Sequence, residues 1–234
     1  MQKVILFICI LLGFLHQGWG QNKSIDSLRI SYDQLYGLDV ILTNGKKYFP
    51  DSRPVTGHPF WKSQDAFSGS LTISGSTFMN QQLKYDLNKQ QFVLFYSNYN
   101  GQPCQIILNN TAIDSVRTEN CLFIPNTNRD IPLPFVQLIS KKNLTYYISW
   151  NKDLILNTLE TPAIYEYTKD YSRSYLTYKG TDYRFYNKSS FLRIFTQKER
   201  TSIKKYLSSN HLKFMKMNDN DLRKLISFYE QTLN

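Results

Sequence analysis

The stretch that decides the fold is LKYDLNKQQFVLFY, residues 83–96. Apolar and polar side chains alternate in its first half, which places Leu83, Tyr85 and Leu87 on one face of an extended chain. The polar pair Asn88-Lys89 interrupts this alternation, and the same period of two returns in FVLFY. Two alternating runs on either side of a short polar turn are typical of a β-hairpin, so the segment predicts two antiparallel strands.

The same design recurs on both sides of this hairpin. GSLTISG (69–75) alternates like a strand, VQLISKKNLTYYISW (136–150) turns at Lys-Lys-Asn, and SYLTYKGTDYRFYN (174–187) turns at Lys179-Gly180. Hairpins in series without long helices between them favour an antiparallel sheet over a parallel α/β fold. We therefore expect a β-rich body over residues 37–187.

The chain from residue 188 onward has a helical pattern instead. Thr196 and Glu199 have the spacing of a capping box, and a second helix is expected to start at Asn218 or Asp219. The apolar residues of this second helix form one stripe: Leu222, Leu225, Ile226, Tyr229 and Leu233. HLKFMKM (211–217) is predicted as a last strand.

The sequence thus predicts an α+β fold. It has an antiparallel β-rich body built from successive hairpins (37–187) and two C-terminal amphipathic helices within residues 188–234. No linker rich in Gly, Pro or Ser interrupts the pattern, so residues 21–234 are expected to form a single domain.

The first twenty residues, MQKVILFICILLGFLHQGWG, have the layout of a secretory signal peptide. Lys3 precedes an apolar run from Val4 to Leu15, and the small residues Gly18 and Gly20 precede the expected cleavage site. The run is shorter than the roughly 20 apolar residues that a transmembrane helix needs. We expect export to the periplasm, the outer-membrane surface or the medium, with removal of residues 1–20 after Gly20 and no transmembrane span.

Positive charge is concentrated near the C-terminus. The chain has 28 Lys and Arg against 18 Asp and Glu, a net charge of +10, and loss of Lys3 with the signal peptide would leave +9. Residues 188–217 contain a single acid, and six of their basic residues are candidates for anion binding: Lys198, Arg200, Lys204, Lys205, Lys213 and Lys216. For an exported chain the partner would be an anionic lipid or polysaccharide and not a nucleic acid. A solvated helix face explains the same residues equally well.

Tyrosine is dense between residues 165 and 186, where it is interleaved with Lys and Arg. Tyr rings stack on sugars and cations, and their hydroxyl groups form hydrogen bonds. Four of these residues are therefore candidates for an aromatic binding face: Tyr171, Tyr175, Tyr178 and Tyr183. The alternative is that the tyrosines occupy strands and half-buried faces, which Tyr favours.

Two cysteines, Cys104 and Cys121, lie outside the expected signal peptide. Export and an even number of cysteines favour a disulfide, worth about 3 kcal/mol on the loop-entropy model, and two buried free thiols are the alternative. A hairpin turn at Asn109-Asn110 would oppose the bond. It places Cys104 opposite Arg117, about 13 Å of strand away from Cys121.

No motif assigns catalysis. The sequence lacks G-x-S-x-G, H-E-x-x-H and the glycine-rich phosphate loops. His58 in TGHPFW and His211 are the only histidines after residue 20, and their positions fit a turn and a helix end. A calcium loop that starts at Asp219 fails at its sixth position, which needs Gly and has Lys224. We predict no metal and no cofactor, and a secreted hydrolase acting through carboxylates or His58 is the alternative to a binding protein.

Four longer stretches occur in the order LYGLDVILTNGKKYFP, GHPFW, GSLTISGSTFMNQQLKYDLNKQQFVLF and SFLRIFTQKERTSIKKYLSSNHLKFMKMNDNDLRKLISFYEQ. On these stretches the chain resembles a group of uncharacterised exported proteins of Bacteroidetes. The resemblance implies a strand-rich body with lysine-rich C-terminal helices, and it implies no catalytic residue or ligand. We expect an exported envelope protein that binds without catalysis, through its basic C-terminal face or its tyrosine-rich sheet face. Its partner would be an anionic lipid, a polysaccharide or another envelope protein.

Overall fold

The computed structural model describes residues 39–98, 100–128, 130–141, 143–159 and 161–232, together with Leu28 and Tyr32. The chain divides into two units, Met1–Leu38 and Asp39–Asn234, and the helices and strands with defined bounds belong to the second. The expected signal peptide, residues 1–20, lies outside the described residues.

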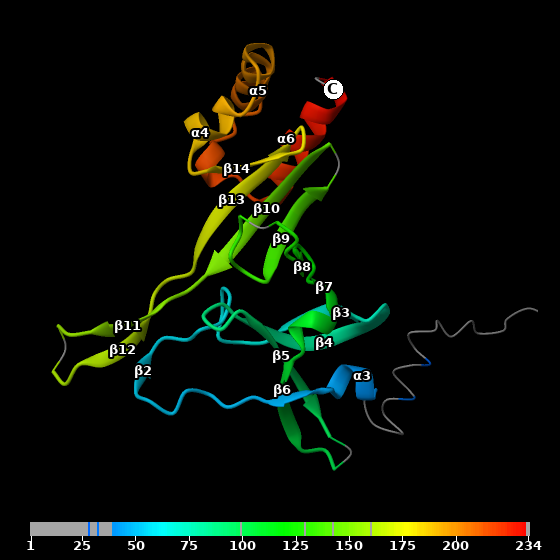
Figure 1. Cartoon of the computed structure of the whole chain (residues 1–234), viewed down its shortest axis with the longest axis vertical. Coiled ribbons are helices and arrows are strands. Elements are labelled where there is room, and N and C mark those ends of the chain that lie inside the picture. The colour runs from blue at the N-terminus through cyan, green and yellow to red at the C-terminus, as the bar shows by residue number, and fades with distance from the viewer. Residues whose placement is uncertain are drawn as a thin grey trace, which may run out of the picture. The chain divides into compact units, whose positions relative to one another are not determined.

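Within the described residues, eleven strands form one antiparallel sheet in the order β1-β6-β5-β4-β3-β7-β8-β9-β10-β13-β14 (Figure 1). Their bounds are β1 Gly45–Lys47, β3 Phe67–Ile73, β4 Ser76–Asp86, β5 Gln91–Ser97, β6 Pro103–Leu108, β7 Ile113–Arg117, β8 Leu122–Pro125, β9 Phe135–Lys141, β10 Leu144–Asn151, β13 Tyr171–Tyr178 and β14 Thr181–Phe185. A second sheet has the order β11-β12-β2, with bounds β11 Leu154–Asn157, β12 Ile164–Tyr167 and β2 Val55–Thr56. The predicted fold class, an antiparallel β-rich body with C-terminal helices, is confirmed.

The predicted hairpin at residues 83–96 is β4–β5. Its register pairs Tyr85 with Phe92, and the two rings stack with centroids 4.3 Å apart. The Asp86 carboxylate closes the turn, because its Oδ1 accepts the backbone N–H groups of Asn88 (3.0 Å) and Lys89 (2.9 Å). The hairpins predicted at 136–150 and 174–187 are β9–β10 and β13–β14. Local turn chemistry therefore supports the register of β4–β5.

The connection after β6 differs from the expectation. β6 pairs with β1 and β5, whereas β7 pairs with β3 and β8, so the hairpin considered at Asn109-Asn110 does not form. Asn109 instead caps a short 3₁₀ helix, η1 (Asn110–Ala112), where its Oδ1 accepts the N–H of Thr111 at 3.2 Å. In the sheet, β5, β4 and β3 therefore lie between β6 and β7, although β6 and β7 are consecutive in the chain.

Helices lie at both ends of the described chain: α3 (Val40–Thr43) precedes β1, and α4 (Lys188–Arg193), α5 (Gln197–Ser209) and α6 (Asp219–Thr232) follow β14. The two predicted helices are α5 and α6, and α4 is an additional short one. The predicted capping box at Thr196 and Glu199 is present, with both reciprocal bonds made. Asn218 caps α6, since its Oδ1 accepts the N–H of Asp221 at 2.9 Å.

The strand predicted at residues 211–217 is wrong, because this segment forms a 3₁₀ turn, η2 (Phe214–Lys216). α5 ends in a Schellman motif: the N–H of Leu212 bonds to the carbonyl of Leu207 (2.9 Å), and the N–H of His211 to that of Ser208 (3.1 Å). His211 has a positive φ of 53° there. The reversal leads the chain through η2 directly into α6.

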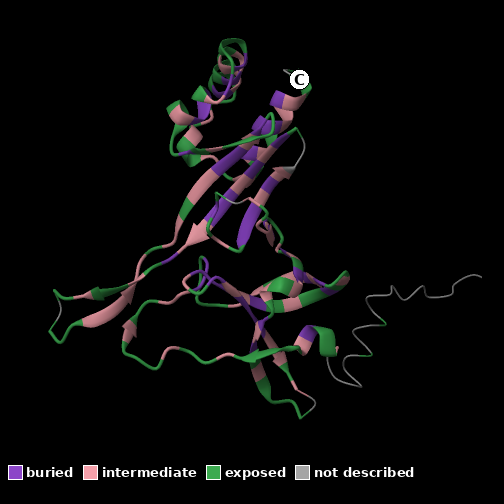
Figure 2. Cartoon of the chain, in the orientation of Figure 1, coloured by how far each residue is buried: buried purple, intermediate pink, exposed green. Residues whose placement is uncertain are grey.

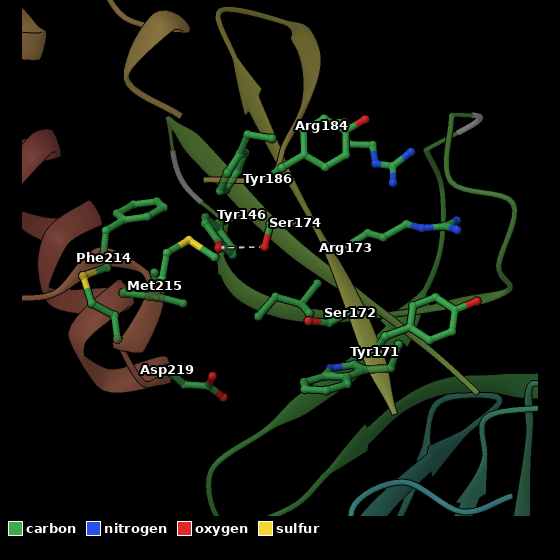
Figure 3. A pocket seen from close by; sticks show the side chains of 15 residues that line it. Tyr146, Tyr171, Ser172, Arg173, Ser174, Arg184, Tyr186, Phe214, Met215 and Asp219 are labelled. Carbon is green, nitrogen blue, oxygen red and sulfur yellow. Dashed lines mark hydrogen bonds between the residues drawn. The ribbon is translucent and has the colours of Figure 1, made fainter. Parts of the chain in front are cut away.

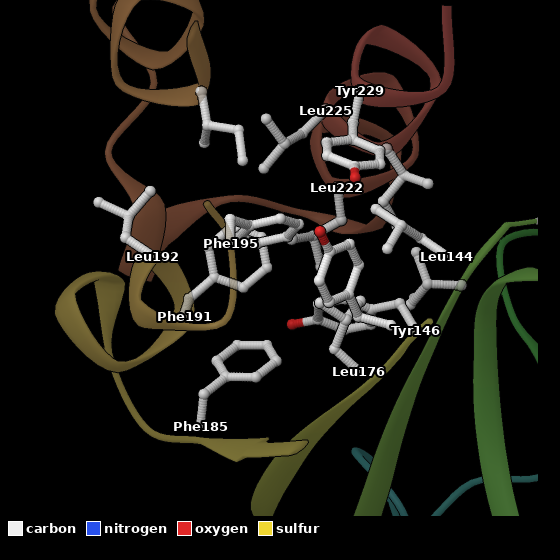
Figure 4. Close-up of a cluster of buried hydrophobic side chains, with 14 of the residues drawn as sticks. Leu144, Tyr146, Leu176, Phe185, Phe191, Leu192, Phe195, Leu222, Leu225 and Tyr229 are labelled. Atoms are coloured by element: carbon white, nitrogen blue, oxygen red, sulfur yellow. The ribbon is translucent and has the colours of Figure 1, made fainter. Parts of the chain in front are cut away.

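The three C-terminal helices cover one face of β10, β13 and β14 with a shared core (Figure 4). The described part of the predicted stripe on α6 is buried in it, and Figure 2 colours buried positions of this helix purple. Phe191 and Phe195 join from the α4 side (Figure 4). At the centre of this core, Glu199 is 7% exposed and accepts hydrogen bonds from the hydroxyls of Tyr178 (3.0 Å) and Tyr229 (2.7 Å). Burial raises the pKa of Glu199, but the hydrogen bonds from Thr196, Tyr229 and Tyr178 outweigh it and lower the pKa to about 2.

Candidate functional site

A cavity of about 490 Å³, here called the groove, lies between the helix-covered face of β10 and β13 and the segment formed by η2 and the start of α6 (Figure 3). Its apolar lining consists of Ile148, Trp150, Phe185, Phe214, Met215, Met217 and Leu222. Met215 is 69% exposed, although it belongs to this lining. The groove is therefore a solvent-reachable cavity with an aromatic and methionine-rich wall, which suits an apolar group of a ligand.

The groove is also lined by polar side chains: Tyr146, Tyr171, Ser172, Arg173, Ser174, Arg184, Tyr186 and Asp219. The hydroxyl of Tyr146 lies 3.1 Å from Ser174 Oγ. Burial raises the pKa of Tyr146 to about 12, so this hydroxyl is a neutral hydrogen-bonding group at physiological pH. Asp219, the first residue of α6, places a carboxylate in the groove (Figure 3).

Asp219 is held by a chain of hydrogen bonds that starts in the sheet. The indole N–H of Trp150 donates to Gln137 Oε1 (2.7 Å), and Gln137 Nε2 in turn donates to Asp219 Oδ2. The thiol of Cys121 donates to the same carboxylate oxygen at 3.4 Å. Burial and the neighbouring Asp219 raise the pKa of Cys121 to about 11. The thiol therefore stays protonated at neutral pH and serves as a donor and not as a nucleophile.

The groove also reaches the edge of β13. Four consecutive residues of this strand line it, 171–174. Successive side chains on a strand point to opposite faces, so a cavity confined to one face would be lined by every second residue. The register with β14 ends at the pair Ser174–Phe185, and among the described residues no strand pairs with the outer side of residues 171–173. We call these three residues the open edge.

Two arginines beside the open edge belong to strand positions on the opposite face of the sheet, although both also line the groove. Arg173 and Arg184 line a second cavity of about 410 Å³ together with Asp130, Pro132, Tyr175 and Asp182. Because Arg184 pairs with Tyr175, it is a diagonal neighbour of Arg173 on the same face. Figure 3 shows both guanidinium groups pointing away from Met215 and Asp219. Arg173 lies 5.7 Å from the ring centroid of Tyr171, and Arg184 4.6 Å from that of Tyr186.

The structure does not bring the four candidate tyrosines together on one face. Tyr175 and Tyr178 are buried, in different core clusters, and Tyr183 packs beside the same cluster as Tyr178. Tyr171 lines the groove. The alternation of β13 separates Tyr175 from Tyr178, because their positions differ by an odd number of residues.

The candidate anion-binding residues divide into two groups. Five are exposed, on α5, in the turn that follows it and on η2: Lys198, Lys204, Lys205, Lys213 and Lys216. Arg200 is half-buried, and its guanidinium donates to the carbonyls of Leu192 (3.0 Å) and Phe195 (3.1 Å). The guanidinium of Arg200 therefore satisfies carbonyl groups at the end of α4 and has a structural role.

Cys104 and Cys121 are both free thiols, so the predicted disulfide is not formed. Cys104 is on β6, opposite Tyr96 of β5, and Cys121 follows β7. β5, β4 and β3 lie between β6 and β7 in the sheet. At about 4.8 Å per strand, this order keeps the two sulfur atoms well beyond the reach of a disulfide.

His58 is half-buried in a loop held by a buried lysine. Its Nδ1 accepts the N–H of Phe60 (3.2 Å), and Lys152 Nζ donates to the carbonyls of His58 (3.0 Å) and Phe60 (3.1 Å). Burial and the charge of Lys152 lower the pKa of His58. These contacts serve the loop geometry, as expected for a histidine in a turn.

Sequence reasoning missed the groove, because its lining comes from β10, β13, η2 and α6, which only the tertiary structure brings together. The sequence singles out Asp219 only as a possible calcium ligand or as the start of a helix. The one available signal was the alternation in TYYISW and YSRSYL, which places Trp150 and Tyr146 on one face.

Among the residues that the structure describes, no group of three or more His, Cys, Asp and Glu side chains is arranged to hold a metal ion. No helix in that part of the chain is both long and apolar enough to cross a membrane. Comparison with known proteins gives no match: no family model, no curated protein and no solved structure is significantly similar to the chain.

Proposed function

We propose that the chain is an exported envelope protein that binds its partner without catalysis, and that the groove is its binding site. Residues 1–20 support the export, through their signal-peptide pattern. The observation that carries the binding role is the groove itself: a cavity of about 490 Å³ that combines an apolar, partly aromatic wall with two arginines and a single carboxylate held in place from the sheet.

The chemistry of the groove supports binding over turnover. Its thiol neighbour, Cys121, is kept protonated, and two of its hydroxyl groups, Tyr146 and Ser174, bond to each other. The wall offers flexible Met side chains and aromatic rings, which adapt to and cover an apolar group of a partner. The apolar part of this wall suits an apolar side chain of another envelope protein, and the polar groups of the groove can bond to the backbone and polar side chains of the same partner.

The test uses the dye 1-anilinonaphthalene-8-sulfonate as an apolar probe, with energy transfer from Trp150 as the readout. Met215→Glu places a charge at the groove without entering the core, because Met215 is 69% exposed. Burial of a Met side chain is worth roughly 1.5–3 kcal/mol, so we expect dye binding to weaken about tenfold. Met79→Glu is the matched control, because Met79 is also exposed and belongs to β4, outside the groove lining. Equal binding by the Met215 and Met79 variants would refute the assignment.

A further inference from the structure

The open edge supplies a backbone surface beside the groove. Residues 171–173 of β13 pair with β10 on their inner side, as in the pair Ser172–Trp150. On the outer side, β14 stops opposite Ser174 and the chain then turns into α4. Ser172 is exposed although it lies within a strand whose inner side is paired. An edge of this kind presents backbone N–H and C=O groups to another extended chain.

The side chains around the open edge differ between the two faces. On the helix-covered face a neighbouring strand would meet the apolar groove, with Trp150 and Met215 in its wall. On the other face it would meet Arg173 and Arg184. An extended chain points successive side chains to opposite faces, so it would offer apolar and acidic residues to these two surfaces in alternation.

We propose that the ligand is an extended polypeptide segment in which apolar and acidic residues alternate, and that it pairs with the open edge in line with β14. This inference rests on the proposed function of the groove, and it adds the chemical class of the partner. The backbone ladder supplies affinity, the groove selects the apolar side chain, and the arginine pair selects a carboxylate.

Charge favours an acidic segment over a basic one. Arg184 is exposed, and both arginines lie next to the open edge, where each stacks on a tyrosine ring. Asp130 and Asp182 line the same cavity as the arginines, and Asp182 accepts a hydrogen bond from Thr177 of β13. The chain as a whole carries +10, so long-range attraction also favours an acidic partner.

The probe is a fluorescein-labelled, acetylated and amidated heptapeptide, Ser-Glu-Leu-Glu-Leu-Glu-Ser, measured by fluorescence anisotropy on the full chain. We expect saturable binding that is lost when Glu is replaced by Lys. A peptide with Gln for Glu and a free C-terminus separates a side-chain carboxylate from a terminal one. N-methylation of alternate peptide amides tests the backbone ladder: one of the two alternating sets should weaken binding at least tenfold, and the other should leave it nearly unchanged.

Two protein variants separate the surfaces. Arg173→Gln with Arg184→Gln should weaken binding of the Glu peptide about tenfold. Lys204→Gln with Lys205→Gln removes the same charge from α5, and it is the matched control that should bind like the parent. Equal loss in both pairs would mean that only net charge matters, and would overturn the proposal.

The outcomes also separate this proposal from the function on which it rests. If the dye binds and responds to Met215→Glu, but N-methylation of either set has no effect, pairing with the open edge is wrong and the groove remains a binding site. If neither probe binds, the function itself fails. A dimer in light scattering that Met215→Glu dissociates, together with no binding of the peptide, would identify a second copy of the chain as the occupant and would overturn the proposal as well.

Discussion

The buried carboxylate of Glu199 offers the sharpest test of the fold. It accepts hydrogen bonds from Tyr178, Tyr229 and Thr196 within the core that joins α5 and α6 to the sheet. These bonds favour the ionised form and lower its pKa from 4.5 to about 2, against the opposing effect of burial. Because each pKa unit corresponds to about 1.4 kcal/mol, ionised Glu199 contributes about 3 kcal/mol to the free energy of unfolding.

The sign of the pH dependence follows from linkage. Since the folded pKa lies below the unfolded one, the contribution is fully present above about pH 4.5 and is lost as the pH falls through the folded value near 2. Glu199→Gln resembles the protonated acid at every pH. We therefore expect this variant to be about 3 kcal/mol less stable than the parent at pH 7, and the difference to fall below about 1 kcal/mol near pH 2.

The assay is urea unfolding of the purified chain, followed by circular dichroism between pH 7 and pH 2. Tyr229→Phe should cost about 1.5–3 kcal/mol at pH 7, because it removes one hydrogen bond to a charged group. Tyr206→Phe is the matched control, since Tyr206 is a half-buried tyrosine that stacks on Phe228 with ring centroids 4.3 Å apart. A difference between Glu199→Gln and the parent that stays constant over this pH range would refute the reasoning.

Three further predictions concern other parts of the chain. Lys152→Met keeps the buried stem but removes the donor to the carbonyls of His58 and Phe60. The variant should therefore have a free energy of unfolding lower by about 1–3 kcal/mol, and an unchanged urea midpoint would contradict the role of this lysine. Gly69→Ala should destabilise by about 1–3 kcal/mol, because a Cβ there would lie 2.6 Å from the carbonyl oxygen of Arg117 on β7; thermal unfolding checks this. Lys204→Glu with Lys205→Glu should elute earlier from a heparin column than the parent, and equal retention would remove the case for an anion-binding face on α5.

The sequence was sufficient where structure depends on neighbours in the chain. The turn at Asn88-Lys89 is predictable because Asp86 caps it from two residues away, and the start of α5 because Thr196 and Glu199 satisfy each other's backbone groups. Both are local solutions to local hydrogen-bonding needs, and their residue types are specific.

The order of strands in the sheet was not predictable in this way. The segment around Asn109-Asn110 has the residues of a hairpin turn, yet β6 and β7 do not pair. β6 pairs with β5, the strand just before it, and one partner of β7, β3, comes from much earlier in the chain. The same limit applies to the groove, whose walls come from β10 and from η2 and α6. Alternation showed which residues share a face, but not which helix would cover that face.

The reactivity of the Cys121 thiol can report how often α6 detaches from the sheet. It is 4% exposed and bonded to the first residue of that helix, whereas Cys104 is partly open to solvent on a distant strand. An alkylating reagent should modify Cys104 in the folded protein, and it should modify Cys121 only when α6 has moved away from it. The rate of modification at Cys121, compared with that at Cys104, would then report how often the start of α6 separates from the sheet.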